Sequence, residues 1–139
     1  MIRLHAIGFL MLHGLITGAQ SSGLLAGNAH GIANPGFVRW WFTRLGESWL
    51  LSRFGLESRP ILFLTGLLWL AAGVGFVAAG MSLAGWLVPT AWYPTLAAGS
   101  ALISLVLVVL FFHPIYLAAL AINAHVYMAA AGGLNLQEG

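Results

Sequence analysis

The stretch that decides the fold runs from Pro60 to Gln137 and reads PILFLTGLLWLAAGVGFVAAGMSLAGWLVPTAWYPTLAAGSALISLVLVVLFFHPIYLAALAINAHVYMAAAGGLNLQ. Its 78 residues include no Asp, Glu, Lys or Arg. A soluble domain of this size needs charged side chains over most of its surface, and this stretch cannot supply them. We therefore predict that it is embedded in a membrane.

The composition of the whole chain predicts the same class. The chain has 139 residues, of which 60% are hydrophobic and 6% are charged. A helix needs about 20 apolar residues to cross about 30 Å of hydrocarbon, so the chain has room for four spans and one sizeable connection. We predict an all-α membrane protein, with residues 1–139 forming a single integral membrane domain built as a four-transmembrane-helix bundle.

Turn signals divide the apolar sequence into spans. The tract that begins near residue 91 is too long for one crossing, because about 40 helical residues would measure about 60 Å. His113-Pro114 is the expected turn, since proline disfavours helix at the preceding residue and is well placed to begin a new one. A short polar tail, 134–139, ends the chain. The expected spans are about 4–25, 60–81, 91–112 and 114–131.

Residues 26–59 connect the first two spans and carry four of the five arginines. Asn34-Pro35 resembles a helix start and Gly55 a helix end. A helix over about 36–54 would be amphipathic, with three tryptophans and flanking arginines, which is typical of helices that lie among lipid headgroups. We therefore predict an interfacial helix between spans 1 and 2; a helix docked on a partner protein, or irregular structure, are the alternatives. The expected membrane or partner contacts are Arg39, Trp40, Trp41, Arg44 and Trp49.

The arginine distribution also predicts orientation and partners. Because the loop 26–59 holds four arginines and the side of the termini holds Arg3, the positive-inside rule places the loop in the cytoplasm and the termini outside. The expected location is a bacterial inner membrane. Five arginines against three glutamates, without a basic cluster, are too sparse for nucleic-acid binding. The expected partners are therefore the lipid bilayer, with bound lipid, and other membrane protein subunits.

The usual catalytic sets are missing from the sequence. The chain has no cysteine and no aspartate, and its glutamates, Glu47, Glu57 and Glu138, lie outside the predicted spans. An intramembrane carboxylate relay, a thiolate metal site and a cysteine nucleophile are therefore excluded. The motifs HExxH, GxSxG and the Walker loop are also absent. We predict no catalytic residue and no metal site.

Polar residues within the predicted spans are the candidates for a binding site. His13 in the first span, and Asn123 and His125 in the fourth, fall near their helix midpoints and could meet at one level of the bundle. The expected neighbours are Thr65, Ser100 and Ser104. A neutral imidazole can ligate a haem iron or a chlorophyll magnesium, so His13 and His125 could clamp one macrocycle. His113, at the loop side, joins this candidate set, and quinone is the other candidate cofactor. Inter-helix hydrogen bonds, worth about 0.6 kcal/mol each, or a proton relay are the alternative roles.

Three short stretches resemble small, four-span bacterial membrane proteins of the DoxX-like group. They are His13-Gly14-Leu15-Ile16, Leu67-Leu68-Trp69-Leu70-Ala71-Ala72, and Ser104-Leu105-Val106-Leu107 leading into Phe111-Phe112. The resemblance implies an association with quinol oxidation and redox-linked membrane complexes, and it identifies no catalytic residue. The sequence departs from the group in its enlarged first connection and in the lack of basic residues between spans two and three.

These patterns favour a non-catalytic subunit that packs into and stabilises a larger energy-converting membrane complex, respiratory or photosynthetic. The aromatic-rich first connection and two small-residue faces motivate this interpretation, because small residues let helices approach closely. The first alternative is a haem-, chlorophyll- or quinone-binding redox protein that uses the intramembrane histidines. The second is a small-molecule channel or transporter with a path lined by Thr17, Gln20 and Asn123. The small-residue faces are Gly14 with Gly18, and Ala71 with Gly75 and Ala79.

Overall fold

The computed structural model describes residues 2–28 and 30–132, so the predicted tail 134–139 lies outside the described residues. Apart from one isolated bridge, the regular elements in the described part are all helices. The α-helices are α1 (Ile2–Ala19), α2 (Ser21–Leu25), α3 (Trp49–Arg53), α4 (Arg59–Ala84), α5 (Tyr93–Leu110) and α6 (Leu117–Ala131). The 3-10 turns are η1 (Gly36–Val38), η2 (Thr90–Trp92) and η3 (Pro114–Tyr116).

The class of an all-helical membrane protein, predicted from the sequence, is confirmed. Among the described residues, three helical stretches are long and apolar enough to cross a membrane: Arg59–Ala84, Thr90–Leu110 and Pro114–Ala131. The first predicted span, 4–25, is divided into α1 and α2 at Gln20. A fourth crossing, by α1, stays a prediction.

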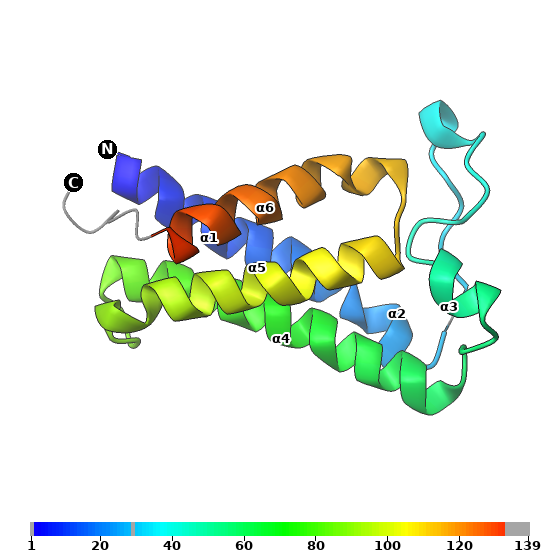
Figure 1. The fold of residues 1–139 in the computed structure, drawn as a ribbon, viewed down its shortest axis with the longest axis horizontal. Helices are drawn as coiled ribbons and strands as arrows, with labels where there is room; N and C mark the ends of the chain where they lie inside the picture. The colour runs from blue at the N-terminus through cyan, green and yellow to red at the C-terminus, as the bar shows by residue number, and fades with distance from the viewer. Residues whose placement is uncertain (1, 29, 133–139) are drawn as a thin grey trace.

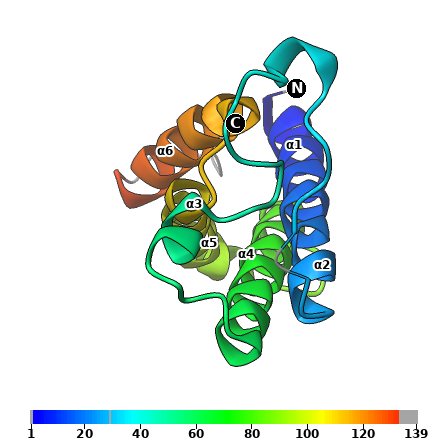
Figure 2. The ribbon, with the colours of Figure 1, turned by 90° about the vertical axis from the view of Figure 1, so that its right-hand side faces the viewer.

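The four long helices lie side by side in the order α1, α4, α5, α6 (Figure 1). Figure 2 shows that they form an open arc with α6 and α1 at its two edges. In the described part of the chain, α1 and α6 do not pack on one another as closely as the successive pairs do. We call the side of the bundle between these two helices the α1–α6 groove.

Glycine faces bring α1 and α4 into backbone contact. A Cβ atom on Gly73 would lie 2.6 Å from Cα and N of Gly18 and 2.7 Å from the carbonyl oxygen of Gly14. Gly75 packs on α5 through a side chain instead, because a Cβ atom on Gly75 would collide with Oγ of Ser100. The small-residue faces predicted from the sequence are therefore largely used for contacts within the chain, although Ala71 is exposed.

The chain turns between α5 and α6 at His113-Pro114, where the sequence predicts it. His113 is extended, with φ −143° and ψ 145°, and its Nδ1 accepts a hydrogen bond of 3.3 Å from the backbone N–H of Ile115. Because Pro114 has no N–H to satisfy, it can begin η3 at no cost in hydrogen bonding. This turn sends α6 back along α5.

The single interfacial helix predicted over 36–54 is wrong, because only η1 and α3 are helical there. Asn34, interpreted as a helix cap, donates instead to the carbonyl oxygens of Trp41 and Thr43, at 3.3 and 2.9 Å. Its Oδ1 also accepts from the N–H of Leu45 at 3.1 Å. One side chain thus satisfies three backbone groups and fixes residues 34–45 as a closed loop in place of a helix.

This connection is attached to the end of the bundle where α5 turns into α6 (Figure 1). Ser48 Oγ donates to the carbonyl oxygen of Leu110 at 2.7 Å, and Trp49 Nε1 donates to that of Val109 at 2.8 Å. These bonds use carbonyls of the last turn of α5, which have no partner within their own helix. The connection is therefore docked on the bundle by its second half.

The residues predicted to contact membrane or partner divide into two groups. The ring of Trp41 packs on those of Phe112 and His113, and Trp49 is bonded to α5 as described above. Trp40 is exposed, as are Arg39 and Arg44. This second group is the more available to lipid headgroups or to another protein, since Trp41 and Trp49 are only partly exposed.

Candidate functional site

A buried chain of hydrogen bonds joins three helices in the middle of the bundle. His13 Nε2 on α1 lies 2.9 Å from Asn123 Oδ1 on α6, and Asn123 Nδ2 donates to Ser104 Oγ on α5 at 2.8 Å. Asn123 is fully buried, and Ser104 and His13 are 1% and 9% exposed. Because an amide oxygen only accepts, this arrangement places the His13 proton on Nε2. His13, Asn123 and Ser104 therefore meet at one level, as their positions in the sequence predict.

The His13 ring is held by two aromatic neighbours. Phe9 stacks on it with ring centroids 5.8 Å apart, and Phe76 meets it edge-on at 4.8 Å. Its Nε2 is already bonded to Asn123, so a haem iron or a chlorophyll magnesium could bind Nε2 only by displacing that bond. The proton on Nε2 leaves the lone pair of His13 on Nδ1, so His13 could ligate a metal only through Nδ1 while its bond to Asn123 is kept.

His125 does not share a cavity with His13. It follows Asn123 by two positions, and residues two apart on a helix point to different sides. Asn123 is buried in the bundle, whereas His125 is exposed and lines a second cavity. The pair of axial ligands predicted from the sequence is therefore not brought together.

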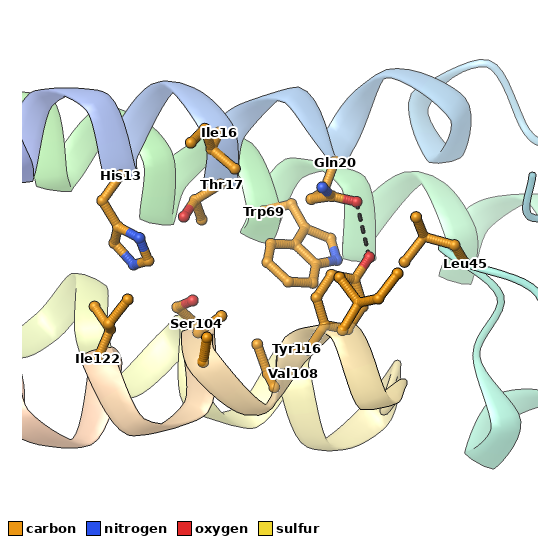
Figure 3. A pocket seen from close by; sticks show the side chains of 13 residues that line it. His13, Ile16, Thr17, Gln20, Leu45, Trp69, Ser104, Val108, Tyr116 and Ile122 are labelled. Atoms are coloured by element: carbon orange, nitrogen blue, oxygen red, sulfur yellow. Dashed lines mark hydrogen bonds between the residues drawn. The ribbon is translucent and has the colours of Figure 1, made fainter. Parts of the chain in front are cut away.

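A cavity of about 310 Å³ lies in the α1–α6 groove next to the hydrogen-bonded chain (Figure 3). Tyr116 closes one end of it, since its hydroxyl donates to Gln20 Oε1 at 3.0 Å, and His13 lies toward the other end. Among the described residues, no Asp, Glu, Lys or Arg lines it. Its volume is at the lower end of the range for small-molecule sites, about 300–1,000 Å³. The polar side chains of the lining, besides the indole of Trp69, are His13, Thr17, Gln20, Ser104 and Tyr116.

The hydrogen bonds within the protein determine which donor groups of the cavity lining remain for a ligand. Ser104 Oγ accepts from Asn123, so its own O–H can be donated elsewhere. Gln20 accepts from Tyr116 through Oε1, so its NH₂ group is left to donate. Two donors on an otherwise apolar surface suit a ligand that carries uncharged oxygen acceptors.

Sequence reasoning did not find the aromatic part of this site. Tyr116 and Trp69 contribute to the cavity and lie near one another, with ring centroids 6.5 Å apart. The available signal was their residue type, because a tyrosine or tryptophan within a span combines an apolar ring with a polar group that needs a partner. For Thr17 and Gln20, the sequence predicts a role only as lining of a channel or transporter path.

His113 lies outside this cavity, beneath the loop 34–45. It is fully buried, and its Nε2 finds no acceptor among the described residues. Trp41 Nε1 and Thr43 Oγ1, in the loop itself, are also buried without a partner in the described part of the chain. His113 therefore serves the turn, where its Nδ1 caps η3, and does not contribute to the candidate cofactor site.

Burial gives His113 an expected effect on stability. It lowers the pKa of the imidazole below its ordinary value of 6.5, so the folded protein holds the ring neutral while the unfolded chain takes up a proton near pH 6.5. Stability should therefore be complete above about pH 6.5 and fall as the pH drops below it. His113→Asn keeps an acceptor at the cap position and should flatten this dependence. Unfolding midpoints of both proteins across this pH range test the prediction, and an unchanged slope in the variant would contradict it.

The fold and the site define a membrane-embedded helical protein with a cavity in the α1–α6 groove that no charged side chain of the described residues lines. Comparisons of the chain with family models, with curated proteins and with solved structures find no match. The resemblance to the DoxX-like group stays a prediction.

Proposed function

We propose that this protein binds the neutral, polar head of a lipid-soluble molecule in the cavity of the α1–α6 groove. The observation that carries the proposal is the buried chain from His13 through Asn123 to Ser104, which ends on the wall of an uncharged, mostly apolar cavity. In hydrocarbon surroundings, a bundle keeps buried polar groups only where they have partners or a function. Ser104 has both a partner and a free hydroxyl proton at the cavity.

The chemistry of the lining supports an uncharged head with carbonyl oxygens. An ionised head would be costly to bury where no residue of opposite charge lines the cavity. The aromatic rings of Trp69 and Tyr116 suit a flat ring, and the donors of Ser104 and Gln20 suit its oxygens. Of the cofactors predicted from the sequence, quinone therefore fits best, since His125, the second expected ligand of a haem or chlorophyll, lines a different cavity from His13.

The proposal includes a four-span topology with α1 as the additional crossing. α1 lies along α4 over much of its length, with contacts that run from Gly80 beside Met11 to Gly73 beside Gly18. The residue numbers of the contacts fall along α4 as they rise along α1, so the two helices are antiparallel. We retain the expectation of a bacterial inner membrane with loop 26–59 on the cytoplasmic side.

Ligand binding by the purified protein tests the proposal, with the ubiquinone head group on an alkyl chain as probe. We expect saturable quenching of tryptophan fluorescence, and an affinity about tenfold lower for Ser104→Ala, the loss of one hydrogen bond. Ser100→Ala is the matched control, because Ser100 is also buried on α5, one turn away, but does not line the cavity. Absence of saturable binding, or equal losses in the two variants, would refute the proposal.

A second candidate function is that of a subunit in a larger membrane complex. The observation that favours it is the cluster of Phe37, Trp40 and Phe42, which are 72–76% exposed at the end of the bundle. An aromatic surface of this kind suits an interface with another protein or with headgroups. Purification in a mild detergent tests this function, because stoichiometric companion chains would support a subunit and a lone chain would count against one.

A further inference from the structure

A second cavity, of about 200 Å³, lies in the α1–α6 groove beyond His13. Its lining is mostly apolar and includes two polar side chains, Tyr93 of α5 and His125 of α6, but no Asp, Glu, Lys or Arg of the described chain. The apolar lining residues are Ala6, Phe9 and Leu10 of α1 and Val126 and Ala129 of α6. The stacked rings of Phe9 and His13 separate it from the first cavity, because Phe9 lines the second cavity and His13 the first. The two cavities therefore adjoin.

The lining residues follow one continuous face on each helix. On α1, the face passes from Gln20 through His13 and Phe9 to Ala6 in steps that match helical spacing. On α6 it runs in the opposite direction, from residue 118 in the first cavity to Ala129 in the second. Ala6 and Gln20 are 14 positions apart, which corresponds to about 21 Å along a helix. The two cavities thus follow one another along the α1–α6 groove, and most of the hydrogen-bonding groups line the first.

We propose that the ligand is an amphiphile with a long apolar chain, and that this chain follows the α1–α6 groove past His13 and Phe9 into the second cavity. This inference rests on the proposed function, since it assumes that the head occupies the first cavity. A second, mostly apolar cavity that adjoins a polar head site fits a hydrocarbon or isoprenoid chain. It does not fit a compact ligand, which would leave the second cavity without an occupant.

The absence of cysteine from the chain makes a positional test direct. The probe is the ubiquinone head group on an alkyl chain that ends in a methanethiosulfonate, which forms a disulfide with a nearby thiol and expels methanesulfinate. Ala129→Cys places a thiol in the second cavity. Met128→Cys is the matched control, because Met128 is the preceding residue at nearly the same depth, is 63% exposed and does not line the cavity.

We expect the probe to label Ala129→Cys about a hundredfold faster than Met128→Cys, because a bound head raises the effective concentration of the chain end. Excess unreactive ubiquinone analogue should abolish the difference. Equal labelling at both positions, or the same preference with an alkyl methanethiosulfonate that has no head, would overturn the inference. The fluorescence titration with the wild-type protein distinguishes the two possible failures. If only the inference about the chain is wrong, the protein still binds the ubiquinone head group; if the proposed function is wrong, no binding is seen.

Discussion

Gly73→Ala is expected to destabilise the bundle by about 3 kcal/mol, a large effect for one added methyl group. The new Cβ would lie 2.6 Å from backbone atoms of Gly18 and 2.7 Å from the carbonyl oxygen of Gly14. Backbone atoms within a helix cannot rotate aside as a side chain does, so α1 and α4 would have to separate. Separation would weaken the close packing that holds these helices together in lipid.

Reversible unfolding in mixed micelles measures this effect, and Gly8→Ala on α1 is the control. A Cβ on Gly8 meets nothing within 4 Å. Alanine also has a better helix propensity than glycine by about 1 kcal/mol, so the control should be neutral or slightly stabilised. If the two variants lost equal stability, the close α1–α4 contact would be contradicted.

The features that the sequence predicts well depend on local chemistry. The absence of charge over residues 60–137 requires a membrane, and the turn at His113-Pro114 follows from the backbone restrictions of proline. The GxxxG pair of α1 predicts a close helix contact, but it does not identify its partner. That partner, Gly73, lies in a helix with several other small residues, and only the three-dimensional arrangement distinguishes among them.

The connection between α2 and α4 shows where pattern reasoning fails. Its spacing of aromatic and charged residues fits a helix, and Asn34-Pro35 fits a helix start. The same asparagine can also bond to backbone groups further along the chain, and its bonds to residues 41, 43 and 45 outweigh the helical alternative. Residue types that cap helices also stabilise loops, so the sequence does not decide between them.

The sequence predicts how deep in the bundle each candidate site residue lies, but not the side of the helix to which its side chain points. Position within a span places His13 and Asn123 at one level, and the structure brings them together. Depth alone also groups His125 with them, although helical spacing could have shown that Asn123 and His125 point to different sides. The bond between Gln20 and Tyr116 joins residues 96 positions apart, and no local pattern predicts it.

Asn123→Leu is expected to lower the free energy of unfolding by about 2 kcal/mol and to weaken ligand binding with it. The substitution roughly keeps the side-chain volume but removes the bonds to both His13 and Ser104. Hydrogen bonds between membrane helices contribute about 0.6 kcal/mol on average and up to about 1.7, and a buried donor left without a partner adds a further cost. Ligand affinity should fall because Ser104 would no longer be held in place by Asn123.

A double-mutant cycle with His13→Leu distinguishes this network from simple packing. If His13 and Asn123 act through their bond, the double variant should lose less stability than the two single variants together, because each single variant leaves the other partner unpaired. Unfolding in mixed micelles supplies the four free energies. Strict additivity would contradict the bond between α1 and α6, and the cavity would then lack the polar support on which its proposed ligand depends.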